Sequence, residues 1–167
     1  MKLHRTRVPS PVGEIILVHR PDDAVIVHLD FEDCPERLNS LLARRFGGIE
    51  LDDAPHVDGQ RALDGYFEGR FDMLDRLDVD PGGTEFQNRL WLGLRDIRAG
   101  TTATYADMAL RLGNPRAVRA VGRTNGLNPI ALILPCHRVI GKDGSLTGYA
   151  GGLERKAWLL RHEGALL

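Results

Sequence analysis

Cysteine is scarce in this chain of 167 residues, which contains only Cys34 and Cys136. Two cysteines about a hundred positions apart make neither a disulfide framework nor a paired metal-binding motif. Long apolar runs are also missing, and none approaches the roughly 18 residues that a membrane-spanning helix needs. Residues 1–7 lack the apolar core of a signal peptide. We therefore expect a protein of the reducing cytoplasm, without a membrane partner, in which a single thiol persists as a thiol.

Acidic residues are scarce in the carboxyl-terminal part of the chain. Residues 98–167 contain 10 Lys and Arg against 4 Asp and Glu, a net charge of +6. Residues 1–97 contain 12 against 19, a net of −7, and the two parts sum to the −1 of the chain. This asymmetry is typical of a protein whose basic part meets a polyanion, although chance and a solvated acidic face would produce the same counts.

The remaining composition is that of an ordinary globular protein, with 43 % hydrophobic and 27 % charged residues. The length suffices for one large domain or two small ones. The clearest break is the Asp-Pro-Gly-Gly stretch at 80–83, which predicts a domain boundary. We expect an α/β domain over residues 1–80 and a mostly helical domain over residues 81–167, an α+β protein overall.

Period-two alternation and turn residues organise the amino-terminal part. The β-rich runs at 13–19 and 24–31 flank a Pro-Asp-Asp turn and predict an antiparallel hairpin. Apolar residues at helical spacing predict one helix that opens at Cys34-Pro35 and ends at Gly47, and another over 60–67. Residues 74–79, in which Leu77 and Val79 stand between aspartates, predict a short edge strand.

Capping signals organise the part beyond the break. Thr84 with Gln87 has the spacing of a capping box, and Thr104 is placed to cap a helix over 105–112. Asn114-Pro115 predicts the start of the next helix. Two short helices joined by a glycine-containing turn are a helix-turn-helix candidate, although many helical hairpins bind nothing.

The second of these helices carries a one-sided basic face. At 100° per residue, Arg116, Arg119 and Arg123 fall within about 60° of one another, opposite Val118 and Val121. No acidic residue occurs between positions 108 and 142 to neutralise them. We interpret this face as a nucleic-acid contact in preference to a merely solvated surface.

Cys136 is the candidate reactive group. It follows an apolar run at 130–134, which predicts a buried strand that ends at the thiol. A thiol at neutral pH needs a base or positive surroundings to react, and His137 and Arg138 are adjacent. Neighbouring strand residues point to opposite faces, so the histidine would reach the thiol through a water. For a lone Cys-His pair, an inert buried cysteine is the simpler interpretation.

Two other residues bear on the chemistry of this site. Glu163 falls at the end of a predicted tail helix, where a carboxylate gains nothing from the helix dipole. It is either exposed and incidental or held there by a partner such as a histidine. Cys34 lies in a different predicted domain from Cys136, so we expect no zinc site and no other metal.

Several motifs together resemble the O6-alkylguanine-DNA alkyltransferases, the methylated-DNA–protein-cysteine methyltransferases. Pro135-Cys136-His137-Arg138-Val139 resembles their active-site signature. The other matching stretches are residues 83–87 with Trp91, 104–105, 113–122, 125–129, and 146–153 with Lys156 and Glu163. The resemblance is dense over about residues 80–165 and weaker before it, mainly at 10–13 and 66–69.

The resemblance implies a role for each matching residue. Cys136 would accept the alkyl group, His137 would take the thiol proton through a water, and Glu163 would hold His137. Asn128 would tie the helix-turn-helix to the active-site segment, and Tyr105 would help extrude the nucleotide and protonate the leaving guanine. The implied substrate-binding residues are Tyr105, Val139, Tyr149, Ala150 and Lys156. The implied DNA-binding residues are Arg116, Arg119, Ala120, Gly122 and Arg123, with Arg119 filling the vacated stack.

The implied function is DNA repair by a single irreversible transfer of the alkyl group from O6-alkylguanine to Cys136 without any cofactor, with O4-alkylthymine left open as a second substrate. The implied partner is double-stranded DNA, met by a monomer, with cooperative assembly on DNA left open. The implied amino-terminal fold is ribonuclease H-like, with a small antiparallel sheet. Two alternatives remain: a non-catalytic sensor of alkylated DNA, against which Cys136 argues, and a cysteine hydrolase, which leaves the arginine face unexplained.

Overall fold

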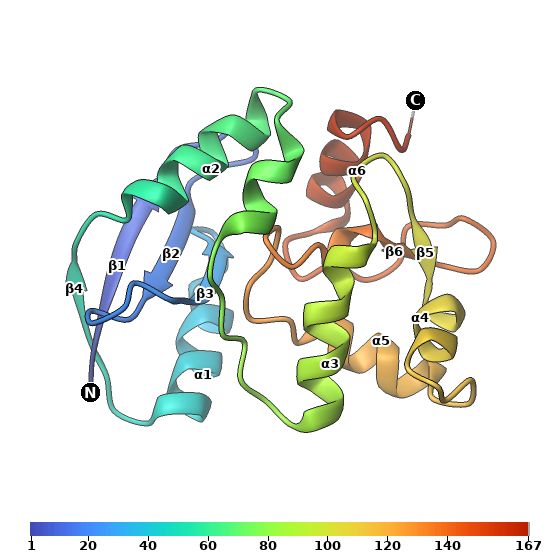
Figure 1. Cartoon of the computed structure of the whole chain (residues 1–167), viewed down its shortest axis with the longest axis horizontal. Helices are drawn as coiled ribbons and strands as arrows, with labels where there is room; N and C mark the ends of the chain where they lie inside the picture. The colour runs from blue at the N-terminus through green and yellow to red at the C-terminus, as the bar shows by residue number, and fades with distance from the viewer. Residues whose placement is uncertain (167) are drawn as a thin grey trace. The chain divides into compact units, whose positions relative to one another are not determined.

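A computed structural model describes residues 1–166 of the chain, and none of the helices in that range is both long and apolar enough to cross a membrane. The fold is a mixture of helices and small sheets (Figure 1). The chain divides into two compact units, the first comprising Met1–Gly82 and the second beginning at Gly83. The division falls within the Pro-Gly-Gly break of the sequence.

The first unit contains a four-stranded mixed sheet. Its strands are β1 (Lys2–Val8), β2 (Ile15–His19), β3 (Ile26–Phe31) and β4 (Glu50–Asp53), in the order β3-β2-β1-β4. The antiparallel pairing of β2 with β3 confirms the predicted hairpin. The expectation of a wholly antiparallel sheet is wrong, because β4 runs parallel to β1. Both of these strands are polar and lie at or beside an edge, so their sequences lack the apolar runs that identified β2 and β3.

Two predicted helices of this unit are confirmed. Helix α1 (Pro35–Phe46) buries Leu38 and Leu42 against the sheet, and α2 (Val57–Phe67) begins three residues before the predicted start. The edge strand predicted at 74–79 is wrong over 74–76, because Phe71–Arg76 forms a 3₁₀ helix, η1. At the end of the predicted range, Val79 does pair with Ile26 of β3, in an isolated parallel bridge. Leu74 and Leu77 are buried three positions apart, the spacing that a 3₁₀ turn places on one side.

The second unit is mostly helical. It contains α3 (Glu85–Gly93), η2 (Leu94–Asp96), β5 (Ala103–Thr104), α4 (Tyr105–Arg111), α5 (Val118–Gly126), η3 (Cys136–Arg138), β6 (Val139–Ile140) and α6 (Leu153–His162). The two short strands β5 and β6 are parallel. Capping boxes at Thr84 with Gln87 and at Thr104 with Asp107 begin α3 and α4. Local capping chemistry therefore fixes where these two helices start.

Helix α5 begins later than its sequence predicts. The Ala117 N–H donates to the Asn114 carbonyl at 3.0 Å, which closes a turn, and the helix starts at Val118. Arg116 therefore precedes the helix, and the predicted face of three helical arginines is wrong. Of the two valines opposite the arginines, Val121 is buried, whereas Val118, in the first helical turn, is 37 % exposed.

The apolar run before Cys136 is buried as expected, but the predicted strand is wrong. Residues 131–133 form a turn, which is closed by a hydrogen bond of 3.0 Å from the Leu134 N–H to the Ile130 carbonyl. Leu132 takes a left-handed backbone conformation with φ of +70°. Such a conformation costs a non-glycine residue free energy, and the surrounding structure must hold it in place. Burial in this segment thus comes from a folded-back loop.

Candidate active site

Cys136 opens the 3₁₀ turn η3 and is 6 % exposed. It is not part of a disulfide. Its N–H donates to the Leu134 carbonyl at 2.8 Å, and its own carbonyl accepts from Asn125 Nδ2 at 3.3 Å. Both ends of the peptide unit that carries the thiol are therefore held by hydrogen bonds.

Asn128 holds the loop that leads to Cys136. Its Nδ2 donates to the Leu134 carbonyl at 2.8 Å, and its Oδ1 accepts from the Ile130 N–H at 3.0 Å. These two bonds satisfy backbone groups that a neighbouring strand would otherwise satisfy. A side chain outside the apolar run thus replaces the predicted strand pairing and explains the tight loop.

His137 and Glu163 form a buried pair. His137 Nε2 lies 2.8 Å from Glu163 Oε2, and neither side chain is exposed. Burial lowers the pKa of His137 and outweighs the opposing effect of the Glu163 carboxylate. The imidazole is therefore neutral at pH 7, with Nε2 donating to the carboxylate. Its buried Nδ1 has no hydrogen-bond partner within residues 1–166 and carries the lone pair of a base.

Arg138 completes this group, a contact that sequence reasoning missed. Its Nε and Nη2 each donate to Glu163 at 2.9 Å, and its Nη1 donates to the Ile97 carbonyl at 2.7 Å. Burial alone would raise the pKa of Glu163, but His137 and Arg138 outweigh it and lower the pKa to about 2. Glu163 therefore remains a carboxylate. The sequence placed an arginine directly after the Cys-His pair, but no local pattern indicated which acidic residue Arg138 would bind.

Lys156 brings a second cation to the site. Its fully buried side chain donates from Nζ to the Val139 carbonyl at 2.7 Å and the Thr147 carbonyl at 2.9 Å. Burial lowers the pKa of Lys156 to about 8, and the neighbouring Cys136 opposes that shift. The lysine thus joins β6 to the 141–150 loop and adds positive potential beside the thiol.

Tyr105 contacts the same loop. Its hydroxyl donates to the Thr147 carbonyl at 3.1 Å and accepts from Thr147 Oγ1 at 3.3 Å. Farther along the loop, the Tyr149 ring lies edge-on to His137 with centroids 6.5 Å apart, and Ala150 is exposed. The 141–150 loop is therefore held near the Cys136 group from α4 and from α6.

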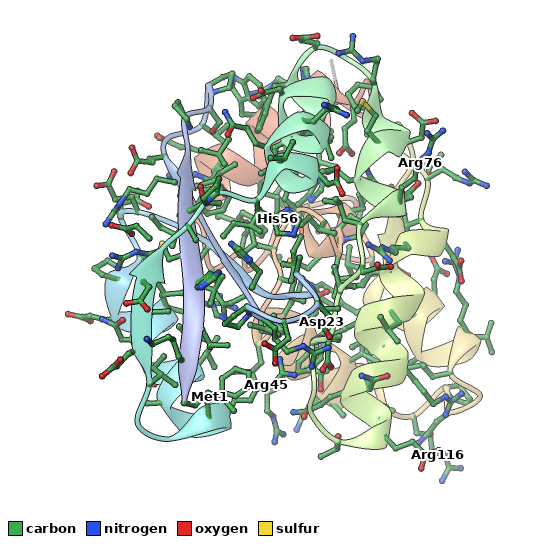
Figure 2. The ribbon with its side chains drawn as sticks, turned by 60° about the vertical axis from the view of Figure 1, so that its left-hand side comes forward. Met1, Asp23, Arg45, His56, Arg76 and Arg116 are labelled. Atoms are coloured by element: carbon green, nitrogen blue, oxygen red, sulfur yellow. The ribbon has the colours of Figure 1, made fainter. Side chains whose placement is uncertain are left out.

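The predicted DNA-binding residues lie on and before α5. The side chains of Arg116, Arg119 and Arg123 are exposed, and Ala120 and Gly122 are half-buried. Figure 2 shows Arg116 projecting from the ribbon. A Cβ at Gly122 would meet the Tyr105 ring at 3.9 Å, so α5 runs close to the start of α4 here. Three solvent-exposed arginines thus lie on α5 and the turn before it.

Within residues 1–166, no cluster of three or more His, Cys, Asp or Glu side chains could hold a metal ion. The candidate site therefore consists of a thiol, a neutral imidazole held by a carboxylate, and two buried cations. Such a set can deprotonate and orient a sulfur nucleophile.

Comparison with known proteins gives a consistent result. A family model described as 6-O-methylguanine DNA methyltransferase, DNA binding domain, matches residues 85–165. The methylated-DNA–protein-cysteine methyltransferase of Salmonella typhimurium is 41 % identical over 100 % of this chain and 99 % of its own length. That of Methanosarcina barkeri is 41 % identical over 93 % of this chain and 94 % of its own. The structure of Mycobacterium tuberculosis OGT in complex with DNA aligns with a TM-score of 0.81 and 36 % identity, covering 97 % of this chain and 93 % of the other.

Proposed function

The chain belongs to the methylated-DNA–protein-cysteine methyltransferases, DNA repair proteins that act by alkyl transfer, and from that premise we propose Cys136 as the residue that receives the alkyl group. The proposed substrate is O6-alkylguanine in double-stranded DNA, with O4-alkylthymine as a second possible base. The proposal includes a reducing compartment such as the cytoplasm, because an oxidised thiol could not accept an alkyl group.

The proposed reaction is one displacement. The Cys136 sulfur forms a bond to the alkyl carbon while the bond from that carbon to guanine O6 breaks, and the electron pair stays on the guanine. The thiol proton leaves through His137, and the guanine takes up a proton from Tyr105. A thioether is stable under these conditions, so each molecule would react once, and no cofactor is needed because donor and acceptor are both present.

The single observation that carries the proposal is the His137–Glu163 pair beside the thiol. Glu163 accepts from Nε2, which leaves the lone pair of Nδ1 available for a proton. Cys136 and His137 are consecutive residues of a 3₁₀ turn, so their side chains diverge, and we propose a water between Sγ and Nδ1. This geometry supports a general base that acts through one water.

The base would bind among groups already close to the thiol. The Val139 carbonyl and the backbone near Tyr149 and Ala150 would hold the edge of the purine. Lys156 would hold the Val139 carbonyl and the 141–150 loop in fixed positions relative to each other. Its Nζ donates to the Val139 carbonyl at 2.7 Å and to the Thr147 carbonyl at 2.9 Å, which supports this role. The Tyr105 hydroxyl, at the start of α4 and bonded to Thr147 of the same loop, would lie near the purine ring.

DNA would be engaged through α4 and α5, used as a helix-turn-helix. An alkylated oxygen inside a duplex is out of reach, so the nucleotide must be extruded at a cost of about a few kcal/mol. Arg119 would fill the vacated stack with its flat guanidinium group. Arg116 and Arg123 would contact phosphates, and the small residues Ala120 and Gly122 would allow a close approach. The protein would act as a monomer, and the mixed sheet of the first unit would be a reduced ribonuclease H-like sheet.

Intact-protein mass spectrometry tests the proposal. After incubation with a duplex carrying O6-methylguanine, we expect a mass increase of one CH₂ group, which peptide mapping places on Cys136. Cys136→Ala should bind the duplex as tightly as the wild type and gain no mass. Tight binding without an adduct in the wild type would favour the sensor alternative, and catalytic turnover of an ester would favour the hydrolase.

A further inference from the structure

Asn125 is a buried polar residue of α5 that none of the proposed steps uses. It is 5 % exposed, and its Nδ2 donates to the carbonyl of Cys136 at 3.3 Å. Its Oδ1 is also buried and has no hydrogen-bond partner within residues 1–166. A buried acceptor without a partner costs at least as much free energy as one intramolecular hydrogen bond contributes. Stability therefore does not explain why an asparagine stands here.

The position of Asn125 on α5 connects two surfaces. At 100° per residue, Asn125 lies about 40° from buried Val121 and about 160° from exposed Arg123. One side of the helix thus presents arginines to solvent, while the other side contacts the peptide of the nucleophile. The same short helix can therefore bear on DNA and on the thiol together.

The backbone beside Asn125 is itself held in place. The buried indole of Trp91, on α3, donates from Nε1 to the Thr124 carbonyl at 2.7 Å. This bond fixes the last turn of α5 next to the asparagine. A donor on a fixed backbone can set the direction of the Cys136 carbonyl, and with it the direction of the Cα–Cβ bond that leads to the sulfur.

We propose that Asn125 is a positioning residue for alkyl transfer, which holds the Cys136 peptide so that the sulfur lies in line with the bond to be broken. The inference rests on the proposed role of Cys136 as acceptor. Its action is separate from that of Asn128, which bonds to the loop before the nucleophile. Asn125 contacts the nucleophilic residue itself.

Asn125→Leu is the sharpest test, because leucine has the branched shape of asparagine and no donor. Single-turnover reactions with a duplex carrying O6-methylguanine, over a range of protein concentrations, give the maximal rate constant and the half-saturating concentration. We expect the maximal rate constant to fall by about tenfold or more. The half-saturating concentration should stay unchanged, and the thermal midpoint should be equal or higher.

Thr124→Val is the matched control, since it alters the neighbouring buried side chain and leaves the Trp91 bond to the backbone intact. It should keep the wild-type rate constant. If Asn125→Leu fails to fold, Asn125→Ala removes the same donor without adding apolar atoms and carries the same expectation.

Two results would overturn the inference. One is a wild-type rate constant in a folded Asn125→Leu or Asn125→Ala variant. The other is a fall in the rate constant that is proportional to the fall in the thermal midpoint in all the variants, Thr124→Val included. That pattern would show that Asn125 acts only on the stability of the fold. Failure of the proposed function is distinguishable, because the wild-type protein would then show no adduct on Cys136.

Discussion

Glu163 binds two residues, and it has a different effect on each of them. It accepts from neutral His137 and from the guanidinium of Arg138, and all three side chains are buried or nearly so. The arginine neutralises the carboxylate, and the carboxylate orients the imidazole. A carboxamide in its place would keep the shape but leave Arg138 without a counter-charge.

We therefore expect Glu163→Gln to lose about 3–5 kcal/mol of unfolding free energy at pH 7, as removal of one partner of a buried pair does. Transfer to Cys136 should slow as well, because the imidazole loses its charged acceptor. Urea unfolding and single-turnover rates measure the two effects. Glu154→Gln, an exposed change at the start of the same helix, is the control and should alter neither.

The acid limb of stability follows from the same residue. The pKa of Glu163 falls from 4.5 to about 2 on folding, so its contribution is complete above pH 4.5 and is lost as the pH falls toward 2. That shift corresponds to about 3 kcal/mol. The slope of unfolding free energy between pH 4.5 and 2 should be shallower in Glu163→Gln than in the wild type. Parallel slopes in the two proteins would contradict this assignment.

Arg119 allows a test of base extrusion. Arg119→Ala should slow transfer from a duplex substrate by about tenfold or more, because nothing then fills the vacated stack. Reaction with free O6-benzylguanine needs no extrusion and should keep its rate. Equal losses on the two substrates would argue against the role proposed for Arg119.

Helices with strong local signals are the elements that sequence predicts best. Thr84 and Thr104 each form a capping box with the residue three positions later, and these boxes begin α3 and α4. A short-range sequence pattern is therefore enough to predict where the two helices start. The turn before α5 and the loop before Cys136 were mispredicted for the opposite reason. In the loop, the Asn128 amide supplies the bonds that a strand partner would supply, and apolar periodicity carries no trace of such a bond.

The cap of α4 is testable on its own. Thr104 Oγ1 accepts from the Asp107 N–H at 3.0 Å, and the Asp107 carboxylate accepts from the Thr104 N–H at 2.9 Å. Thr104→Ala should lower the unfolding free energy by about 1 kcal/mol. Thr104→Ser keeps the hydroxyl and should lower the unfolding free energy much less. Equal losses of unfolding free energy in the serine and alanine variants, measured by denaturant unfolding, would rule out the cap as the cause.

Over the whole molecule, the charge asymmetry predicted a polyanion partner, and the family membership agrees with DNA. Burial patterns and capping led to the right kind of fold, a mixed α+β one. The candidate site was proposed from motifs, and the resemblance predicted the contact between His137 and Glu163. The contact between Arg138 and Glu163 was missed, because the two residues are 25 positions apart in the sequence. Pairing at that distance depends on how α6 packs, which no local pattern encodes.

Salt dependence tests the basic region at this scale. Each phosphate contact adds about 0.9 to the slope of log affinity against log salt, so replacing both Arg116 and Arg123, the residues proposed to contact phosphates, by alanine should reduce the slope by about 2. Fluorescence anisotropy with an unmodified duplex at several salt concentrations gives this slope. Arg70→Ala, which breaks an exposed pair with Glu68 in the first unit, should leave it unchanged.

The residues that surround Cys136 are also synthesised in a particular order. Asn125 and Asn128 precede it in the chain, whereas Lys156 and Glu163 follow it, with Glu163 26 positions after His137. A ribosome therefore synthesises the two asparagines that hold the segment of the proposed nucleophile before the residues proposed to activate it. During synthesis the thiol of Cys136 would have the low reactivity of an ordinary cysteine. It would become reactive only when α6 packs against the segment that carries Cys136 and His137. Late activation of this kind would protect a single-use protein from wasting itself on cellular electrophiles before it is finished.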